Sequence, residues 1–249
     1  MSKLAGATTV KAGFEIAEGF DAALAAAGLT SFEAVMRVET SPSAVMRAVP
    51  GRTTVRLETP RGTFYLKRYV GRCPAAAARH EWSMLDAAAR VGIAVPRAVA
   101  LGERRALFTV RESFLLTEEI VGGVQADWWI TRQGGDRARL LEPIAGLARR
   151  FHDAGFHHQD FYLCHFFVAE KGPALSLSLI DFQRCGFHRG RRRWIVKDLA
   201  QLHRSMVTTG FSEGEWEALL RAYGGLDPAT ARAVQQKSRR IAQHVPKHG

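Results

Sequence analysis

The chain has 249 residues, of which 47% are hydrophobic and 24% charged, as in an ordinary globular protein with material for one large domain or two lobes. The formal net charge of +11 predicts attraction to polyanions such as nucleic acid, anionic lipid surfaces or phosphorylated glycolipids. Three cysteines without a C-x-x-C pair argue against a disulfide framework and a zinc ribbon, and no apolar run reaches the roughly 20 residues of a membrane span. With no signal-peptide pattern at the N-terminus, we expect a cytosolic protein.

The first half of the chain predicts an antiparallel sheet with few helices. Residues 16–28 are alanine-rich and predict a helix, and Thr30 with Glu33 forms a capping-box pattern for a short helix through Arg37. Alternating residues then predict strands at 45–48, 53–58, 63–69, 95–101 and 107–120. Between the third and fourth strands, Pro74 suits the first turn of a helix that runs to about Arg90, with Trp82, Leu85 and Ala89 on one face.

The second half is mainly helical. Gly122-Gly123 is expected to form a hinge, and helices are predicted at 140–153, 195–206, 213–223 and 228–243. We therefore predict an α+β, protein-kinase-like bilobal fold. Residues 1–120 would form a sheet-rich N-lobe that binds the nucleotide phosphates, and residues 121–249 a helical C-lobe with the catalytic loop and metal site.

One stretch between the predicted helices concentrates chemistry. Residues 156–167 read F-H-H-Q-D-F-Y-L-C-H-F-F, and after a predicted hairpin comes I-D-F-Q at 180–183. The spacing Asp-x4-His, hairpin, Asp-Phe follows the protein-kinase plan H-R-D-x4-N, hairpin, D-F-G. We assign Asp160 as the catalytic residue that faces the attacking hydroxyl, and Asp181 and His165 as magnesium ligands. Asp160 as a loop cap and His165 as a brace of the loop remain alternatives.

A lysine and a glutamate complete the nucleotide site in this plan. Lys67 lies in the strand segment Y-L-K-R-Y, and Glu81 follows on the next helix, where it can hold the lysine against the phosphates. A surface lysine at a sheet edge is the alternative. On the segment L-L-T-E-E-I that leads into the hinge, we place Glu118 and Ile120 among the nucleotide-binding residues.

Together these features resemble the lipopolysaccharide core heptose kinase family, bacterial sugar kinases with a protein-kinase-like fold. The resemblance runs from about Val45 to Met206 and is carried by Y-L-K-R-Y, A-A-R-H-E-W-S-M-L, L-L-T-E-E-I and above all H-Q-D-F-Y-L-C-H-F-F. The segments I-D-F-Q and W-I-V-K-D-L-A-Q-L also match the family pattern. One departure is Gln159, which stands where the family commonly has arginine.

The resemblance implies transfer of the ATP γ-phosphate to a heptose hydroxyl of the inner core, with Mg²⁺, at the cytoplasmic face of the inner membrane. Lys67 would bind phosphates, Asp160 act on the hydroxyl and Asp181 hold magnesium. His158 and Asp198 would support the catalytic loop, Asp198 by analogy with the kinase fold. The implied partners are the inner-core glycolipid and an anionic membrane surface to which the protein binds peripherally; no nucleic acid is expected.

A basic run after Asp181 suits an anionic acceptor. Guanidinium groups bind phosphates and carboxylates bidentately, so we assign four arginines to acceptor binding, with a solvated charged loop as the alternative: Arg189, Arg191, Arg192 and Arg193. Other functions stay open. In one alternative the same fold acts on Kdo, a small-molecule hydroxyl or a protein, and in another the chain is a basic binding module with a relic kinase loop. A metal-dependent hydrolase would use His157, His158, His165 and Asp160.

Overall fold

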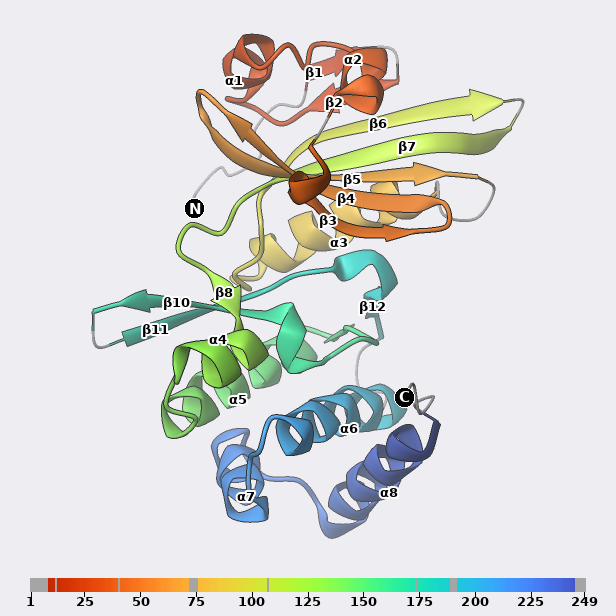
Figure 1. Cartoon of the computed structure of the whole chain (residues 1–249). Coiled ribbons are helices and arrows are strands. Elements are labelled where there is room, and N and C mark those ends of the chain that lie inside the picture. Colours follow the sequence, from red (N-terminus) through yellow and green to blue (C-terminus); the bar gives the residue numbers. More distant parts are fainter. Residues whose placement is uncertain are drawn as a thin grey trace, which may run out of the picture. The chain divides into compact units, whose positions relative to one another are not determined.

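The computed structural model describes residues 9–11, 13–39, 41–71, 76–106, 108–172, 174–188 and 192–244 (Figure 1). Contacts within the chain divide it into two compact units. The N-terminal unit is Met1–Asp86 with Pro96–Glu119, and the C-terminal unit is Ala87–Val95 with Ile120–Gly249. The lobe boundary at residue 120 and the roles given to the two lobes stay predictions. In this division residues 87–95 group with the second unit.

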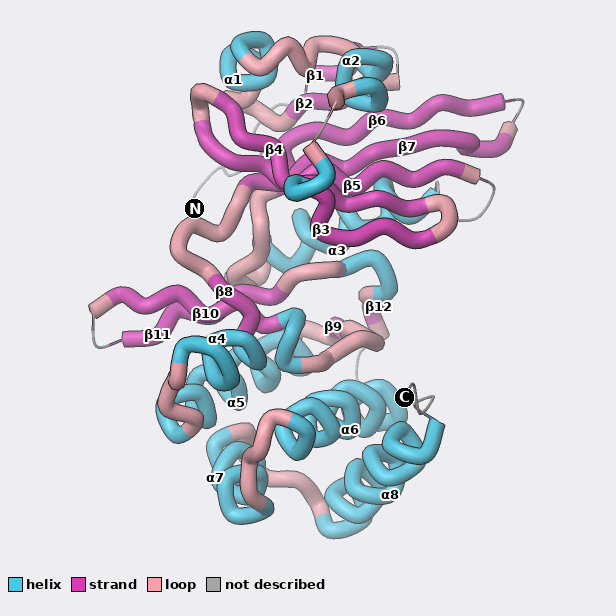
Figure 2. Tube along the Cα trace, in the orientation of Figure 1, coloured by secondary structure: helices cyan, strands magenta, loops and turns pink. Residues whose placement is uncertain are grey.

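A seven-stranded antiparallel sheet organises the N-terminal unit (Figure 2). Its order is β1 (Thr9–Lys11), β2 (Phe14–Ile16), β6 (Ala98–Ala106), β7 (Thr109–Glu118), β5 (Gly62–Val70), β4 (Arg52–Thr59) and β3 (Val45–Val49). The three predicted meander strands are found, each one or two residues longer than expected. The helix expected over 16–28 is instead short, α1 (Asp21–Ala26), because the chain first adds β2 to the sheet edge and turns at Gly19, whose φ is +87°.

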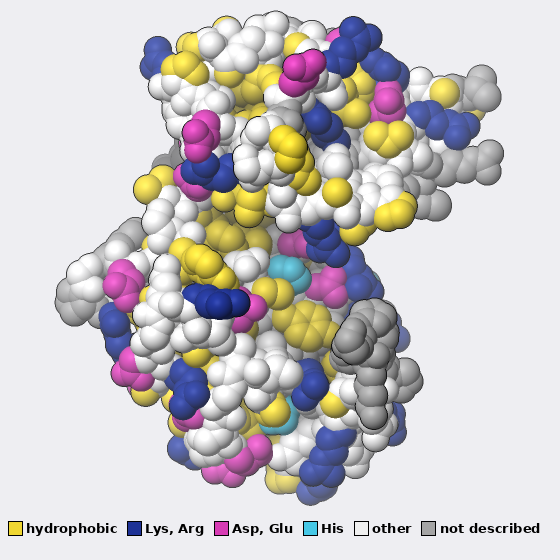
Figure 3. Space-filling model, viewed as in Figure 1, with side chains coloured by type: hydrophobic (Ala, Val, Ile, Leu, Met, Phe, Trp, Pro, Cys, Tyr) yellow, Lys and Arg dark blue, Asp and Glu magenta, His cyan; other side chains and the backbone are white. Residues whose placement is uncertain are grey.

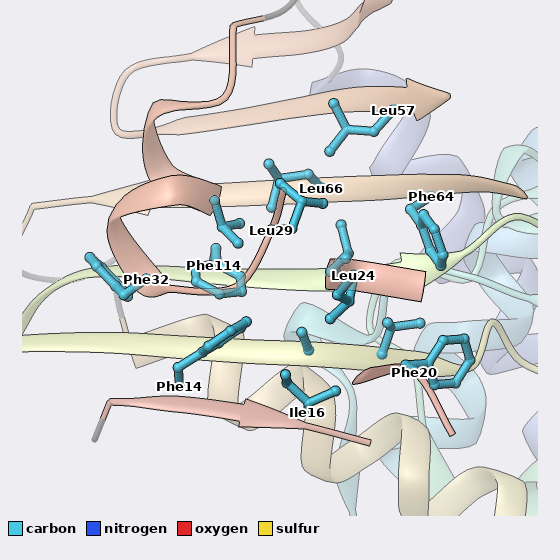
Figure 4. Packing of buried hydrophobic residues seen from close by; sticks show 14 of the residues in the cluster. Phe14, Ile16, Phe20, Leu24, Leu29, Phe32, Leu57, Phe64, Leu66 and Phe114 are labelled. Atoms are coloured by element: carbon cyan, nitrogen blue, oxygen red, sulfur yellow. The ribbon is translucent and has the colours of Figure 1, made fainter. Parts of the chain in front are cut away.

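One face of this sheet carries the hydrophobic core of the unit. α1 and α2 (Phe32–Arg37) lie over this face, and Figure 4 shows Leu24 and Phe32 directed toward Leu66 and Phe114 of the strands. The ring of Phe114 lies 5.7 Å from that of Phe32. The cap of α2 differs from the prediction: the side chain of Ser31, not Thr30, accepts the backbone N–H of Ala34.

The opposite face of the sheet meets α3 (Ala77–Arg90). Because side chains alternate along a strand, Phe64 and Leu66 of β5 enter the hydrophobic core, whereas Lys67 and Tyr69 contact Glu81 of α3. The buried residues of α3 are Ala78, Glu81, Leu85 and Ala88. Of the three residues predicted to share one face, Leu85 is buried, Trp82 is partly buried and Ala89 is exposed. The predicted helix start at Pro74 lies outside the described residues.

The C-terminal unit is mainly helical. Its helices are α4 (Ala126–Gln133), α5 (Ala138–Asp153), α6 (Arg192–Thr208), α7 (Glu213–Ala222) and α8 (Pro228–His244). Two small sheets accompany them: β11 (Ala174–Leu179), β10 (Phe166–Lys171) and β8 (Val124–Gln125), and β12 (Gly186–Phe187) with β9 (Phe156–His157). The predicted hairpin is β10–β11. Within the described residues, no helix combines the length and apolar composition that a membrane crossing requires.

An aromatic core holds the chemistry-bearing loop in this unit. Phe151 of α5 stacks with Phe161 of the loop at 5.9 Å and meets Phe182 edge-on at the same distance. Phe161 in turn meets Phe166 at 4.8 Å. The loop that contains Asp160 therefore has apolar anchors on both sides of the carboxylate. A sheet-rich unit followed by a helical one gives the predicted α+β, kinase-like fold class.

Candidate functional site

Lys67 and Glu81 form a buried ion pair in the N-terminal unit. Lys67 Nζ lies 2.5 Å from Glu81 Oε1, and the hydroxyl of Tyr69 donates to Glu81 Oε2 at 3.0 Å. The Glu81 side chain is 2% exposed and that of Lys67 16%. A buried charge needs a paired and hydrogen-bonded environment, which these two donors supply. The pair fixes the lysine ammonium in one position, as binding of phosphates requires.

The segment after β7 forms a tight turn at the expected hinge. Glu118, the last residue of β7, lies opposite Phe64 of β5. The N–H of Gly123 donates to the carbonyl of Ile120 at 2.8 Å, and Gly122 adopts a φ of +69°. A Cβ on Gly123 would lie 2.7 Å from Ile120 Cγ2, so the turn requires glycine there. The assignment of Glu118 and Ile120 to the nucleotide stays a prediction.

α6 anchors the backbone of the loop that contains Asp160. Asp198, which is fully buried, accepts the backbone N–H of His158 at 2.7 Å and that of Gln159 at 2.9 Å. One turn later, Gln201 Oε1 accepts the N–H of Phe161 at 3.0 Å. Ser205 Oγ accepts the N–H of Leu163 at 3.0 Å. Because these three side chains lie on one face of the helix, they fix the course of the loop from residue 158 to 163.

His158 connects this loop to the residue before Asp181. Its Nε2 lies 2.9 Å from the carbonyl oxygen of Ile180, which can only accept, so Nε2 carries the proton. The ring is fully buried, and this desolvation lowers the pKa of His158, so the imidazole is neutral. Nδ1 then holds a lone pair, and among the described residues it has no hydrogen-bond partner. The contact fits the supporting role predicted for His158, which stays a prediction.

Two non-glycine residues of the described chain have left-handed backbone, and both belong to this site: Gln159 with φ 67° and Asp181 with φ 63°. Such conformations cost of order 1–3 kcal/mol and persist where the surroundings over-determine them. At Gln159 the N–H is held by Asp198, and the carbonyl accepts Gln201 Nε2 at 2.7 Å. The backbone on either side of Asp160 is thus held in a strained but fixed conformation.

The carboxylate of Asp160 meets a guanidinium. Arg184 Nη1 lies 3.0 Å from Asp160 Oδ1 and 3.4 Å from Oδ2. The ion pair is accessible, with the Arg184 side chain 58% and the Asp160 side chain 27% exposed. Arg184 ends the 3₁₀ turn η4 (Phe182–Arg184), three residues after Asp181. Asp160 therefore presents a charged, reachable carboxylate, which is what an acceptor hydroxyl needs.

His165 and Asp181 face each other at a distance that suits a shared cation. His165 Nδ1 donates to the backbone carbonyl of Asp160 at 2.6 Å. In the neutral ring Nε2 therefore carries a lone pair, and it lies 3.8 Å from Asp181 Oδ2. This separation is too long for a hydrogen bond, and one cation can contact both atoms. The same Nδ1 bond also fits the alternative in which His165 braces the loop.

A magnesium ion fits this pair when substrate phosphates share its coordination. No three His, Cys, Asp or Glu side chains form a metal-binding group within the described ranges. Mg²⁺ does not require one, because it is commonly held by one or two carboxylates together with phosphates and water. Asp181 is the natural oxygen ligand of the pair, and the imidazole of His165 is the softer one.

The basic segment is only partly described. Arg189 and Arg191 lie outside the described residues. Arg192 Nε donates to Thr230 Oγ1 of α8 at 2.7 Å, and the guanidinium of Arg193 lies over the ring of Trp194 at 4.7 Å. Figure 3 shows Lys and Arg side chains interspersed with Asp and Glu over the face drawn, so the positive excess is not gathered in one patch there. Acceptor binding by the four arginines stays a prediction.

His157, Cys164 and Cys185 have structural surroundings. His157 stacks on Trp194 with ring centroids 4.3 Å apart, and burial lowers its pKa to about 4. Among the described residues, no three His, Cys, Asp or Glu side chains are grouped as the hydrolase alternative would require. Burial also raises the pKa of Cys164, to about 11, and that of Cys185, which is no environment for a nucleophile.

Three residues of this site were not singled out from the sequence. Gln201 and Ser205 follow Asp198 at spacings of three and seven, which places them on one helix face, but a helix pattern does not say which loop that face meets. Arg184 was treated only as the start of a basic run. Its proximity to Asp160 depends on the turn after Asp181, and the only available signal was its place three residues after that carboxylate.

The family model that matches is described as the lipopolysaccharide kinase (Kdo/WaaP) family, and it covers residues 54–223. This range includes Lys67, Glu81, Asp160, Asp181 and Asp198.

Relatives match over most of the chain. The lipopolysaccharide core heptose(I) kinase WaaP of Pseudomonas aeruginosa is 30% identical over 220 residues, which is 79% of this chain and 81% of that protein. The protein of the same name from Escherichia coli is 28% identical over 246 residues, 84% of this chain and 92% of that protein. A solved structure of WaaP in complex with acyl carrier protein matches with a TM-score of 0.71 and 28% identity, covering 92% of this chain and 98% of that chain.

Proposed function

The chain belongs to the lipopolysaccharide kinase (Kdo/WaaP) family, and from this membership we propose that it transfers the γ-phosphate of ATP to a heptose hydroxyl of the lipopolysaccharide inner core. One observation within the chain carries the proposal. The loop of Asp160 has its backbone fixed by the buried Asp198, while the carboxylate of Asp160 stays reachable. His165 lies five residues after Asp160, and its Nε2 is 3.8 Å from Asp181 Oδ2.

Asp160 is the residue that receives the acceptor. Its carboxylate accepts a hydrogen bond from the attacking hydroxyl, orients the oxygen toward phosphorus and takes its proton as the new bond forms. Orientation needs a carboxylate whose backbone does not move. The hydrogen bonds from His158 and Gln159 to Asp198, and from Phe161 to Gln201, support that requirement.

Cations neutralise the charge on the nucleotide phosphates. Lys67, held by Glu81, binds nucleotide phosphates, and Glu118 and Ile120 contribute to the nucleotide site. Asp181 and His165 hold Mg²⁺, which when bound neutralises phosphate charge. Asp181 reaches its position because His158 bonds the preceding carbonyl and because the left-handed backbone at residue 181 ends the strand there.

The acceptor is an anionic glycolipid at a membrane surface. Arg189, Arg191, Arg192 and Arg193 bind its phosphate and carboxylate groups, and the net charge of +11 favours peripheral binding to the anionic cytoplasmic face of the inner membrane. Exposed charge contacts are screened over about 8 Å at physiological salt. Apparent affinity for the glycolipid is therefore expected to fall with salt more steeply than affinity for ATP.

Nucleotide binding and transfer test the proposal in two steps. At a MgATP concentration 100 times its Kd, bound nucleotide should stabilise the protein by about 2.7 kcal/mol and raise the melting temperature by about 5–10 °C. Radiolabelled γ-phosphate should then appear on core oligosaccharide. Absence of both the thermal shift and the transfer would favour a basic binding module instead.

Two acceptors distinguish a heptose kinase from a Kdo kinase, since the family name covers both. Core oligosaccharide that contains heptose is compared with a truncated core that carries only Kdo. We expect phosphate on the heptose of the first and none on the second, with the position read by mass spectrometry. Phosphate on the Kdo-only acceptor would move the assignment to a Kdo kinase without changing the roles of Asp160 and Asp181.

A further inference from the structure

A cation of the C-terminal unit is placed at the catalytic carboxylate without an assigned function. Arg184 contacts Asp160 through Nη1 alone, at 3.0 and 3.4 Å from the two carboxylate oxygens. A guanidinium has five N–H donors in a rigid fork. Within the described chain, the hydrogen bonds of this side chain all use Nη1, and 58% of the side chain is exposed. The remaining donors can therefore bind a second oxyanion beside Asp160.

The backbone of Arg184 is held, although its side chain is open. Gln159 Nε2 donates to the carbonyl of Arg184 at 2.8 Å, and Gln159 Oε1 accepts from Lys197 Nζ at 3.2 Å. Cys185, which follows Arg184, and Phe182, two residues before it, are buried. Because its backbone is fixed, the guanidinium of Arg184 stays beside Asp160. It is therefore placed to bind an anion there, unlike an arginine on a freely moving loop.

Phosphoryl transfer requires positive charge near the transferred group, and the guanidinium of Arg184 can supply it. Between Asp160 and His165 the loop reads F-Y-L-C and supplies no cation. The phosphoryl group develops charge on its equatorial oxygens, and that charge must be met where the acceptor attacks, beside Asp160. Of the Lys and Arg side chains in the described residues, Arg184 is the one with hydrogen bonds to this carboxylate.

We propose that Arg184 is a catalytic residue that bridges Asp160 and the phosphoryl group in transfer; this rests on the proposed kinase function. A carboxylate accepts at about four lone-pair positions, so Asp160 can bind Arg184 and the acceptor hydroxyl together. The hydroxyl gives its proton to Asp160 and its oxygen forms the new bond to the γ-phosphorus. The bond from that phosphorus to the bridging oxygen breaks, and ADP leaves with the electron pair. Arg184 stays protonated throughout.

The first test measures nucleotide affinity and does not depend on the acceptor. A group that binds the γ-phosphoryl should distinguish ATP from ADP, so Arg184→Ala should weaken MgATP binding about 10- to 100-fold while MgADP binding stays unchanged. The matched control is Arg149→Ala, which also removes an exposed arginine from an ion pair with an aspartate, Asp153, at 2.7 Å. Both variants should melt within about 4 °C of the wild type, since exposed ion pairs contribute little to stability.

The second test measures transfer and its chemical rescue. Arg184→Ala should lower turnover on core oligosaccharide by about 10³-fold or more, and guanidinium ions should restore part of it; they should not restore Asp160→Asn. Arg184→Lys should retain more activity than Arg184→Ala because it keeps the charge.

The outcomes separate this proposal from the kinase assignment. An unchanged ratio of ATP to ADP affinity in Arg184→Ala, equal to that of Arg149→Ala, would show a surface ion pair only and overturn the role of Arg184. A different result would contradict the acceptor assignment alone. In that case the wild-type protein would bind ATP more tightly than ADP through Arg184 but transfer no phosphate to heptose. Arg184 would then remain a γ-phosphate ligand.

Discussion

Two carboxylate–cation pairs in this protein have opposite surroundings. Glu81 pairs with Lys67 between a strand and a helix of the N-terminal unit, with side chains 2% and 16% exposed. Asp160 pairs with Arg184 between two loops of the C-terminal unit, with side chains 27% and 58% exposed. The contact distances, 2.5 and 3.0 Å, do not reveal this difference.

The surroundings decide what each pair can do. Removal of one partner of a buried pair leaves an uncompensated charge away from water, which destabilises a protein by roughly 3–5 kcal/mol. An exposed pair contributes about 0–1 kcal/mol, because water screens it and competes for both groups. The Lys67–Glu81 pair therefore positions a lysine permanently, whereas the Asp160–Arg184 pair can admit further partners such as a hydroxyl or a phosphate.

The strongest test of this comparison is Asp160→Asn. The amide keeps the shape of the side chain but cannot take the hydroxyl proton, so turnover should fall about 10²- to 10⁴-fold. Because the exposed pair adds little stability, the free energy of unfolding should change by less than about 1 kcal/mol. Steady-state kinetics and denaturant unfolding measure the two quantities. Near-normal turnover would remove Asp160 from the catalytic role.

Glu81→Ala tests the buried pair. Lys67 and Tyr69 would both lose the carboxylate that they contact, so the free energy of unfolding should drop by about 3–5 kcal/mol and ATP affinity should fall with it. The exposed pair of Glu33 with Arg104 supplies the control, and Glu33→Ala should leave the midpoint of the same denaturant titration near that of the wild type. Equal losses in the two variants would contradict the distinction drawn from burial.

Asp198→Asn tests the buried carboxylate that accepts two backbone N–H groups of the loop. The asparagine oxygen can accept one of the two N–H groups, and its NH₂ then faces the other, so we expect a loss of about 1–3 kcal/mol. Turnover should fall as well, because the backbone of Asp160 loses its anchor. In the control variant Asp153→Asn, an exposed change on α5, the free energy of unfolding and the turnover should both stay near wild type. Equal values in Asp198→Asn would show that the loop does not depend on α6.

The smallest expected effect is the pH dependence of stability that comes from the buried His157. Burial lowers the pKa of His157 to about 4, below the 6.5 of the unfolded chain. Stability from this group is full above pH 6.5 and is lost as the pH falls from 6.5 to 4, because only the unfolded state takes up the proton. We expect up to about 1 kcal/mol per pH unit. His157→Asn should reduce that slope in unfolding curves; the same slope in the variant would exclude His157 as its source.

The sequence alone determined the elements and the candidate chemistry. Alternation located β4 and β5 within one or two residues, and helical spacing located α6, α7 and α8, because local periodicity reflects which face is buried. The motif spacing singled out Asp160 and Asp181, the family resemblance implied Asp198, and the order of elements indicated a kinase-like α+β fold. It also joined Lys67 with Glu81, whose side chains are in contact.

Only the tertiary structure decided which residues share a neighbourhood when no motif links them. β1 and β2 were missed because an alanine-rich segment nearby favours a helix, and only the free edge of β6 recruits β2 as a strand. Arg184 meets Asp160, and Gln201 holds Phe161, through long-range packing that no local pattern encodes. Burial is likewise a property of the assembled fold, because it depends on neighbours far along the chain. Two ion pairs with similar contact distances therefore become a fixed support in one unit and an open, accessible contact in the other.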